Sequence, residues 1–110
     1  MSQARRAAIA DYKERKSVAG IYALRCAATG EAWVGETLDV DKIFNRLSTS
    51  LRWNGHPRPA LQAAWNAHGA ETFAFETLER MEEAPSAYAR DAALKERRDF
   101  WREKLGAHPV

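Results

Sequence analysis

Two short motifs bring chemically useful side chains onto neighbouring segments of the chain. They are Gly20-Ile21-Tyr22 and Trp33-Val34-Gly35, and Arg46 and His56 follow within the next 21 residues. A tyrosine hydroxyl and an imidazole can each carry a proton, and a guanidinium presents a fork of donors to two phosphate oxygens. These side chains are therefore the first candidates for a functional site.

The segments that must position these residues show alternating strand-like and helix-like patterns. Strands are predicted over 18–26, 31–36 and 71–79, and helices over 3–16, 39–53, 59–68 and 85–105. The turn at Ala27–Gly30 favours an antiparallel hairpin between the first two strands. The predicted fold is α+β, with a small three-stranded antiparallel sheet flanked by helices and an extra N-terminal helix.

Composition limits the class of protein. A chain of 110 residues with 45% hydrophobic and 29% charged residues is typical of one small globular domain. No apolar run approaches the roughly 20 residues of a membrane span, and the basic start lacks the apolar stretch of a secretory signal. The single cysteine, Cys26, excludes an internal disulfide and a cysteine-based zinc site. We therefore expect a cytoplasmic protein without a membrane partner.

The motif pair resembles the two halves of the GIY-YIG signature of a nuclease family, with Trp33 in place of the second tyrosine. Arg46 lies on the following helix, where that family has its arginine, and His56 lies in the next loop. Leu61–Gly69 leads into a phenylalanine-rich strand, as in intron-homing members. The resemblance covers Val18 to Leu105. It implies a GIY-YIG-like domain over residues 18–106, similar to the catalytic domain of homing endonucleases, after a helical extension over residues 1–17.

The resemblance implies hydrolysis of phosphodiester bonds in nucleic acid, with DNA as the expected partner. In the family a tyrosine lies near the attacking water, which assigns that position to Tyr22. Arg46 would stabilise charge on the phosphoryl oxygens, and His56 would carry a proton. A glutamate on the last helix holds one divalent cation in the family, so Mg²⁺ or Mn²⁺ is the implied cofactor.

Two positions depart from the family pattern. An indole N–H donates but cannot accept a proton, so Trp33 cannot act as a base. The residue at the position of the metal-binding glutamate is Arg98. With about 100° per residue, Arg98 shares one helical stripe with Leu94, Trp101 and Leu105, and should face the sheet. The metal ligand is thus unassigned, and the candidate carboxylates are Glu96, Glu76 and Glu36.

Three hypotheses follow from these patterns. The first is a metal-dependent endonuclease, for which we expect Tyr22, Trp33 and Arg46 to converge on one concave face. The second is a nucleic-acid-binding domain on the same fold that has lost catalysis, as Trp33 and Arg98 suggest, with phosphates held by Arg46 and the basic N-terminal helix. The candidate nucleic-acid-binding residues are Arg46, Arg52, Arg58 and Arg98. The third is a protein-interaction module. Ordinary solvated side chains are the alternative for each arginine. The oligomeric state is not indicated by the sequence.

Overall fold

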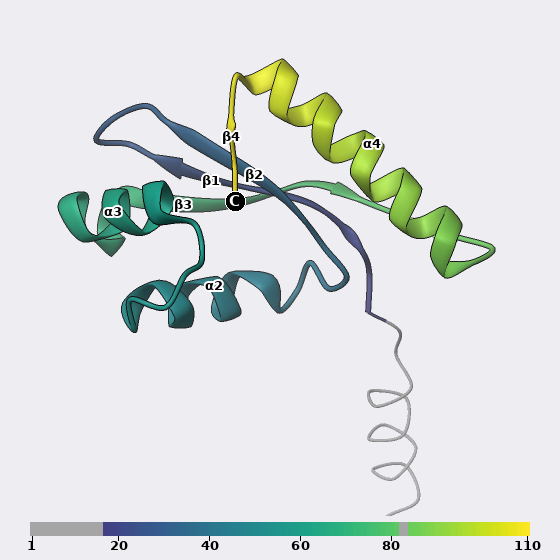
Figure 1. Ribbon diagram of the computed structural model, residues 1–110, viewed down its shortest axis with the longest axis horizontal. Helices are drawn as coiled ribbons and strands as arrows, with labels where there is room; N and C mark the ends of the chain where they lie inside the picture. The colour runs from purple at the N-terminus through teal and green to yellow at the C-terminus, as the bar shows by residue number, and fades with distance from the viewer. Residues whose placement is uncertain (1–16, 82–83) are drawn as a thin grey trace, which may run out of the picture.

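A four-stranded mixed sheet forms the middle layer of the protein (Figure 1). The computed structural model describes residues 17–81 and 84–110, so the helix predicted over 3–16 lies outside the described residues. The strands are β1 (Gly20–Cys26), β2 (Ala32–Thr37), β3 (Phe73–Arg80) and β4 (His108–Pro109). Their order across the sheet is β3-β1-β2-β4, with β1 antiparallel to both β2 and β3, and β4 parallel to β2.

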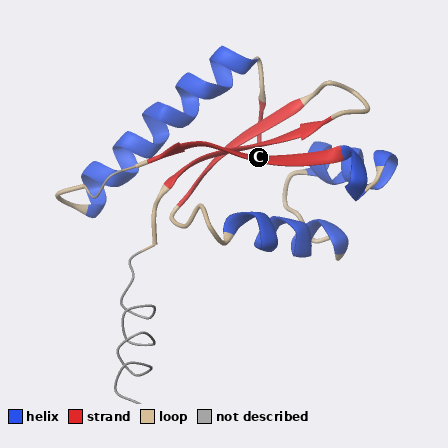
Figure 2. Ribbon diagram, turned by 180° about the vertical axis from the view of Figure 1, so that it is seen from behind, coloured by secondary structure: helices blue, strands red, loops and turns tan. Residues whose placement is uncertain are grey.

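Helices cover both faces of this sheet (Figures 1 and 2). They are α2 (Ile43–Arg52) and α3 (Pro59–His68) on one side and α4 (Ala87–Leu105) on the other, and a 3₁₀ turn, η1 (Ala70–Thr72), precedes β3. None of the helices in the described parts of the chain is long and apolar enough to cross a bilayer. The predicted element order ββααβα is confirmed, because every predicted strand and helix within residues 17–110 is present.

The central strand β1 is buried on both faces because a helical layer covers each of them. Tyr22 and Leu24 point into a cluster with Leu47 of α2, whereas Ile21 and Ala23 point into a second cluster with Leu94 of α4. This two-sided burial explains why the β1 sequence is an almost continuous apolar run instead of an alternating one. The sheet therefore holds the GIY motif rigidly between two cores.

The prediction of a three-stranded sheet was wrong, because His108 and Pro109 add a short parallel strand beside β2. Two residues are too few to show any periodicity, and a proline is tolerated at a sheet edge. Helix α2 begins at Ile43 instead of residue 39. The carboxylate of Asp39 accepts the backbone N–H groups of Asp41 and Lys42, which makes a turn where the helix was expected to start.

Gly20 is the position at which a side chain would disturb the sheet most. A Cβ there would lie 2.1 Å from the carbonyl oxygen of Glu79 and 2.6 Å from Val40 Cγ1. Because a backbone atom cannot yield cheaply, we expect Gly20→Ala to destabilise the fold by about 3 kcal/mol. Urea unfolding of this variant and of Gly55→Ala would check it, since the nearest atom to a Cβ at Gly55 is 3.6 Å away. Equal unfolding midpoints for both variants would contradict the packing described for β1.

Candidate functional site

A cleft of about 360 Å³ lies where β2 meets the C-terminal residues and α4. We call it the β2 cleft, and its lining comprises Tyr22, Val34, Gly35, Glu36, Arg58, Arg98, Arg102, Pro109 and Val110. Both motif strands contribute to it, together with the loop before α3 and the second half of α4. The cleft therefore joins part of the GIY motif to three guanidinium groups and one side-chain carboxylate.

Tyr22 forms the floor of the β2 cleft. Its Cα is paired with that of Gly35 on β2, and its side chain is only 3% exposed. A Cβ on Gly35 would lie 2.6 Å from the Tyr22 hydroxyl oxygen, so glycine is required for the ring to cross the neighbouring strand. Burial, with a smaller contribution from the Glu36 carboxylate, raises the pKa of Tyr22 well above its usual value. The hydroxyl is therefore protonated at neutral pH and can donate a hydrogen bond into the cleft.

The raised pKa of Tyr22 predicts a loss of stability in alkali. The folded state keeps the proton while the unfolded chain releases it above about pH 10, so stability is full below that pH and falls as the pH rises towards the folded-state pKa. We expect a slope of about 1.4 kcal/mol per pH unit from this group. Tyr22→Phe should remove that part of the slope. Urea unfolding of both proteins at pH 8 and pH 11 would measure it, and identical slopes would contradict the burial of an ionisable hydroxyl.

Arg98 reaches across from α4 to β2, as its place on the helical stripe predicted. Its Nη1 donates to Glu36 Oε1 at 2.8 Å, and its Nη2 donates to Asp99 Oδ1 at 3.2 Å. Glu36 is paired with Ile21, which places both side chains on the face of the sheet that α4 covers. The side chains of Arg98 and Glu36 are 26% and 35% exposed, so this ion pair is only partly screened by water.

Arg58 and Arg102 complete the basic wall of the cleft. Arg58 Nη2 donates to the carbonyl oxygen of Val110 at 3.3 Å. The Nε atom of Arg102 is buried and has no hydrogen-bond partner among the described residues. The Nη1 atom of the same side chain lies 3.9 Å from Asp99 Oδ1. A buried N–H without an acceptor is costly. The cleft thus presents three guanidinium groups to any anion that enters it.

The residues of the β2 cleft do not fit the divalent cation that the resemblance implies. The lining has one side-chain carboxylate, Glu36, which already accepts a hydrogen bond from Arg98. No group of three or more histidine, cysteine, aspartate or glutamate side chains is close enough to hold a metal within residues 17–81 and 84–110. Three guanidinium groups would repel a cation. The donor set matches an oxyanion such as phosphate.

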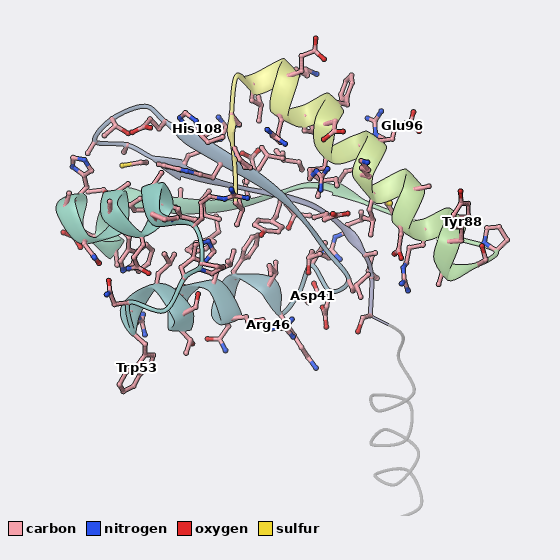
Figure 3. All side chains as sticks on the ribbon, in the orientation of Figure 1. Asp41, Arg46, Trp53, Tyr88, Glu96 and His108 are labelled. Atoms are coloured by element: carbon pink, nitrogen blue, oxygen red, sulfur yellow. The ribbon has the colours of Figure 1, made fainter. Side chains whose placement is uncertain are left out.

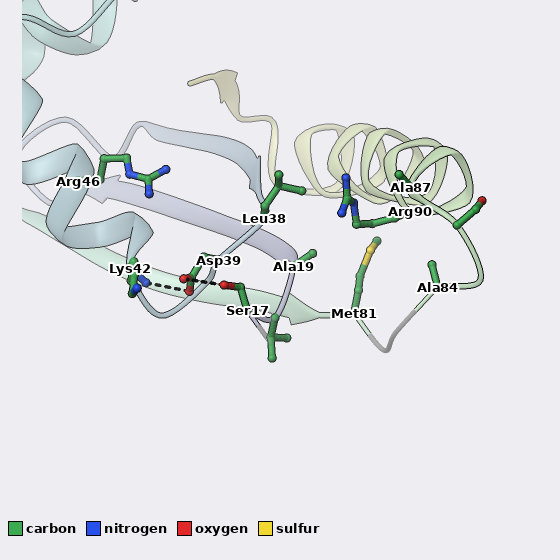
Figure 4. Close-up of a pocket in the computed structure, with 12 residues that line it drawn as sticks. Ser17, Ala19, Leu38, Asp39, Lys42, Arg46, Met81, Ala84, Ala87 and Arg90 are labelled. Atoms are coloured by element: carbon green, nitrogen blue, oxygen red, sulfur yellow. Dashed lines mark hydrogen bonds between the residues drawn. The ribbon is translucent and has the colours of Figure 1, made fainter. Parts of the chain in front are cut away.

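Arg46 lies outside the β2 cleft. It is exposed on α2 and lines a separate hollow of about 820 Å³ together with Leu38 and Arg90 (Figure 4). Ile43 and Leu47 occupy the buried stripe of α2, and Arg46 is one residue, or about 100°, away from Leu47 around the helix. The helical phase therefore turns Arg46 away from Tyr22, although α2 packs on the face of the sheet that Tyr22 occupies.

Trp33 and His56 also lie apart from the cleft lining. Trp33 is 1% exposed and packs in the core beside Phe73, with its Nε1 lacking a hydrogen-bond partner among the described residues. Tyr22, Trp33 and Arg46 thus do not converge on one concave surface.

His56 is half-buried. Burial, followed by the charge of Arg58, lowers the pKa of His56, which favours the neutral imidazole. Its backbone N–H donates to Gln62.

Three other predicted site residues lie outside the β2 cleft and on three different elements. Glu76 is exposed on β3 and forms an ion pair with Arg25 at 2.9 Å. Glu96 is exposed on the side of α4 away from the sheet (Figure 3), and Arg52 is exposed at the end of α2.

Three residues of the cleft were not predicted from the sequence, and they are Arg102, Pro109 and Val110. The spacing of four residues between Arg98 and Arg102 was the signal that could have placed Arg102 there.

With the GIY and WVG motifs paired on adjacent antiparallel strands, the structure has the fold of a GIY-YIG-like nuclease domain. It is similar to the catalytic domain of homing endonuclease I-TevI, with a TM-score of 0.69 and 25% identity over 84% of this chain and 97% of that one. A glutamate-to-alanine mutant of the same intron endonuclease domain gives a TM-score of 0.69 and 26% identity over 81% of this chain and 84% of that one. The resemblance predicted from the sequence is confirmed. No family model and no curated protein matches the chain.

Proposed function

We propose that this chain is a nucleic-acid-binding domain on a GIY-YIG-like nuclease fold, and that the β2 cleft holds a phosphate of the nucleic-acid backbone. The observation that carries this proposal is the pairing of Arg98 with Glu36 at 2.8 Å. In this pair a guanidinium occupies the helix position where the family places a metal-binding carboxylate. The residues of the site decide between functions, because one fold can host several of them.

The geometry of the cleft supports a phosphate for three reasons. Arg58, Arg98 and Arg102 approach from two different elements, so that an anion between them would meet donors from more than one direction. The protonated hydroxyl of Tyr22 is an additional donor. Hydrogen bonds from a guanidinium to a phosphate are roughly twice as strong as neutral ones.

Metal-dependent endonuclease activity is the second candidate function. The observation that favours it is the similarity over most of the chain to catalytic domains of a homing endonuclease. Tyr22 keeps the position of the GIY tyrosine, and Glu36 would be the carboxylate nearest to it. In this alternative the ion pair between Arg98 and Glu36 would have to break before Glu36 could bind a cation, and the energy needed to break it would weaken metal binding.

A plasmid-nicking assay with Mg²⁺ or Mn²⁺ beside a binding assay with a labelled duplex separates the two candidates. We expect no nicking above background with either metal, and binding that weakens steeply as salt rises, because phosphate contacts release counterions. Metal-dependent nicking that Tyr22→Phe abolishes would establish the second candidate. Absence of both nicking and salt-dependent binding would overturn both and favour a protein partner.

A further inference from the structure

The outer face of α2 carries a second surface that the β2 cleft does not use. A shallow groove of about 800 Å³ runs along this face from Asp41 to Trp53. Lys42, Arg46 and Trp53 lie along it at spacings of four and seven residues, which places them on one side of the helix. The Trp53 side chain is 82% exposed and projects away from the sheet at the end of α2 (Figure 3). We call this surface the α2 groove.

The backbone around Trp53 is firmly held although its ring is free. The Trp53 N–H donates to Thr49 O at 3.1 Å, and Gly55 N–H donates to Ser50 O at 2.8 Å. Asn54 adopts a positive φ of 57°, and its side chain accepts a hydrogen bond from Asn66 of α3 at 2.9 Å. The turn thus displays a large aromatic ring from a fixed position, which lowers the ordering cost of a contact made through it.

The charge of the α2 groove is positive. Its one carboxylate, Asp41, is paired with Arg80 at 3.1 Å. Lys42 and Arg46 take part in none of the ion pairs found between described residues. An exposed indole on the same face of the helix as two such cations is complementary to a ligand that has both a flat ring and negative charge.

We propose that the α2 groove binds single-stranded nucleic acid, with an unpaired base stacked on Trp53 and backbone phosphates on Arg46 and Lys42. Stacking on an aromatic side chain is tolerant of sequence because every base has a π-face, and a basic groove follows the backbone. Arg46 and Trp53 are seven residues apart, about 10 Å along the helix axis, so one strand lying along α2 can contact both. The inference rests on the proposed function in taking nucleic acid as the partner.

Binding of a labelled duplex with a single-stranded thymidine overhang, compared with the blunt duplex, tests the proposal. Trp53→Ala should weaken binding of the overhang by roughly 5- to 150-fold and leave the blunt duplex unchanged. Trp53→Phe should keep most of the affinity, whereas Trp53→Leu should not, because leucine lacks a π-face. Tyr88→Ala is the matched control, since Tyr88 is 86% exposed on α4, away from the groove (Figure 3).

The outcomes separate this inference from the proposed function. If Trp53→Ala binds the overhang like the unmodified protein while Arg58→Ala/Arg102→Ala weakens the blunt duplex, the α2 groove proposal fails and the β2 cleft stands. If neither variant changes binding of either probe, both proposals fail. Equal losses on the overhang and the blunt duplex, or full affinity in Trp53→Leu, would overturn base stacking and indicate a contact without an unpaired base. The phosphate contact of Arg46 is checked with Arg46→Gln, which should lower the salt dependence of overhang binding.

Discussion

Arg98→Glu should convert the β2 cleft from an anion site into a cation site. The change removes the guanidinium that neutralises Glu36 and places a second carboxylate beside it, which is the oxygen-rich setting that Mg²⁺ and Mn²⁺ prefer. We expect Mn²⁺ to bind the variant with a dissociation constant of about 10⁻⁴ to 10⁻³ M, the weak end for carboxylate sites. The unmodified protein should show no comparable binding in calorimetry.

The stability of Arg98→Glu should also depend on the metal. Two facing carboxylates in a partly buried site repel each other, so the variant without metal should lose about 1 to 3 kcal/mol of unfolding free energy. Mn²⁺ should restore part of this loss, because a ligand that binds only the folded state stabilises it. Lys95→Glu makes the same charge change at an exposed position of α4. It should neither lower the unfolding free energy by a comparable amount nor respond to Mn²⁺. Equal Mn²⁺ binding by the variant and the unmodified protein would show that the metal site lies elsewhere.

Arg58→Ala/Arg102→Ala should weaken binding of a blunt duplex by about a hundredfold at low salt. Neither arginine makes a short ion pair with a side-chain carboxylate among the described residues, so their removal leaves the contact between Arg98 and Glu36 intact. A charged hydrogen bond contributes roughly 1.5 to 3 kcal/mol, and two that act on one phosphate are not fully additive. The slope of log affinity against log salt should fall by about one, as expected for one lost phosphate contact.

The control for this double variant is Lys95→Ala/Lys104→Ala, which removes two positive charges from α4 outside the cleft. General attraction between a basic protein and DNA would make the two double variants equally weak. The structure predicts a large difference between them, because only the arginines converge on one hollow. Fluorescence anisotropy over a range of salt concentrations measures both the affinity and the slope.

Local sequence rules predicted most of the fold. The bounds of α3 were predicted to the residue because Pro59 suits the first turn of a helix and Gly69, with a φ of 85°, ends it. Residues 18–26 could be recognised as a strand from their composition. The pairing of β4 with β2 could not be predicted, since it depends on where α4 delivers the chain and not on any pattern in His108 and Pro109.

The candidate site shows a similar division between local and tertiary information. The stripe of α4 predicted that Arg98 faces the sheet, and its contact with Glu36 agrees with this. Which carboxylate it would meet depends on the packing of α4 against β2, which sequence spacing does not encode. The role of Arg46 was taken from the resemblance. The apolar positions Ile43, Leu47 and Leu51 already indicated a helical phase that turns Arg46 outward.

Binding of a blunt duplex in the presence of a chelator tests the central claim most directly. If arginines of the β2 cleft hold the phosphate, the affinity of the unmodified protein in EDTA should equal or exceed its affinity in Mg²⁺ at matched ionic strength, because no cation takes part and Mg²⁺ competes for phosphates. Binding that disappears in EDTA and returns with Mg²⁺ or Mn²⁺ would contradict the account. It would mean that a metal ion, and not Arg58, Arg98 and Arg102, holds the nucleic acid in this cleft.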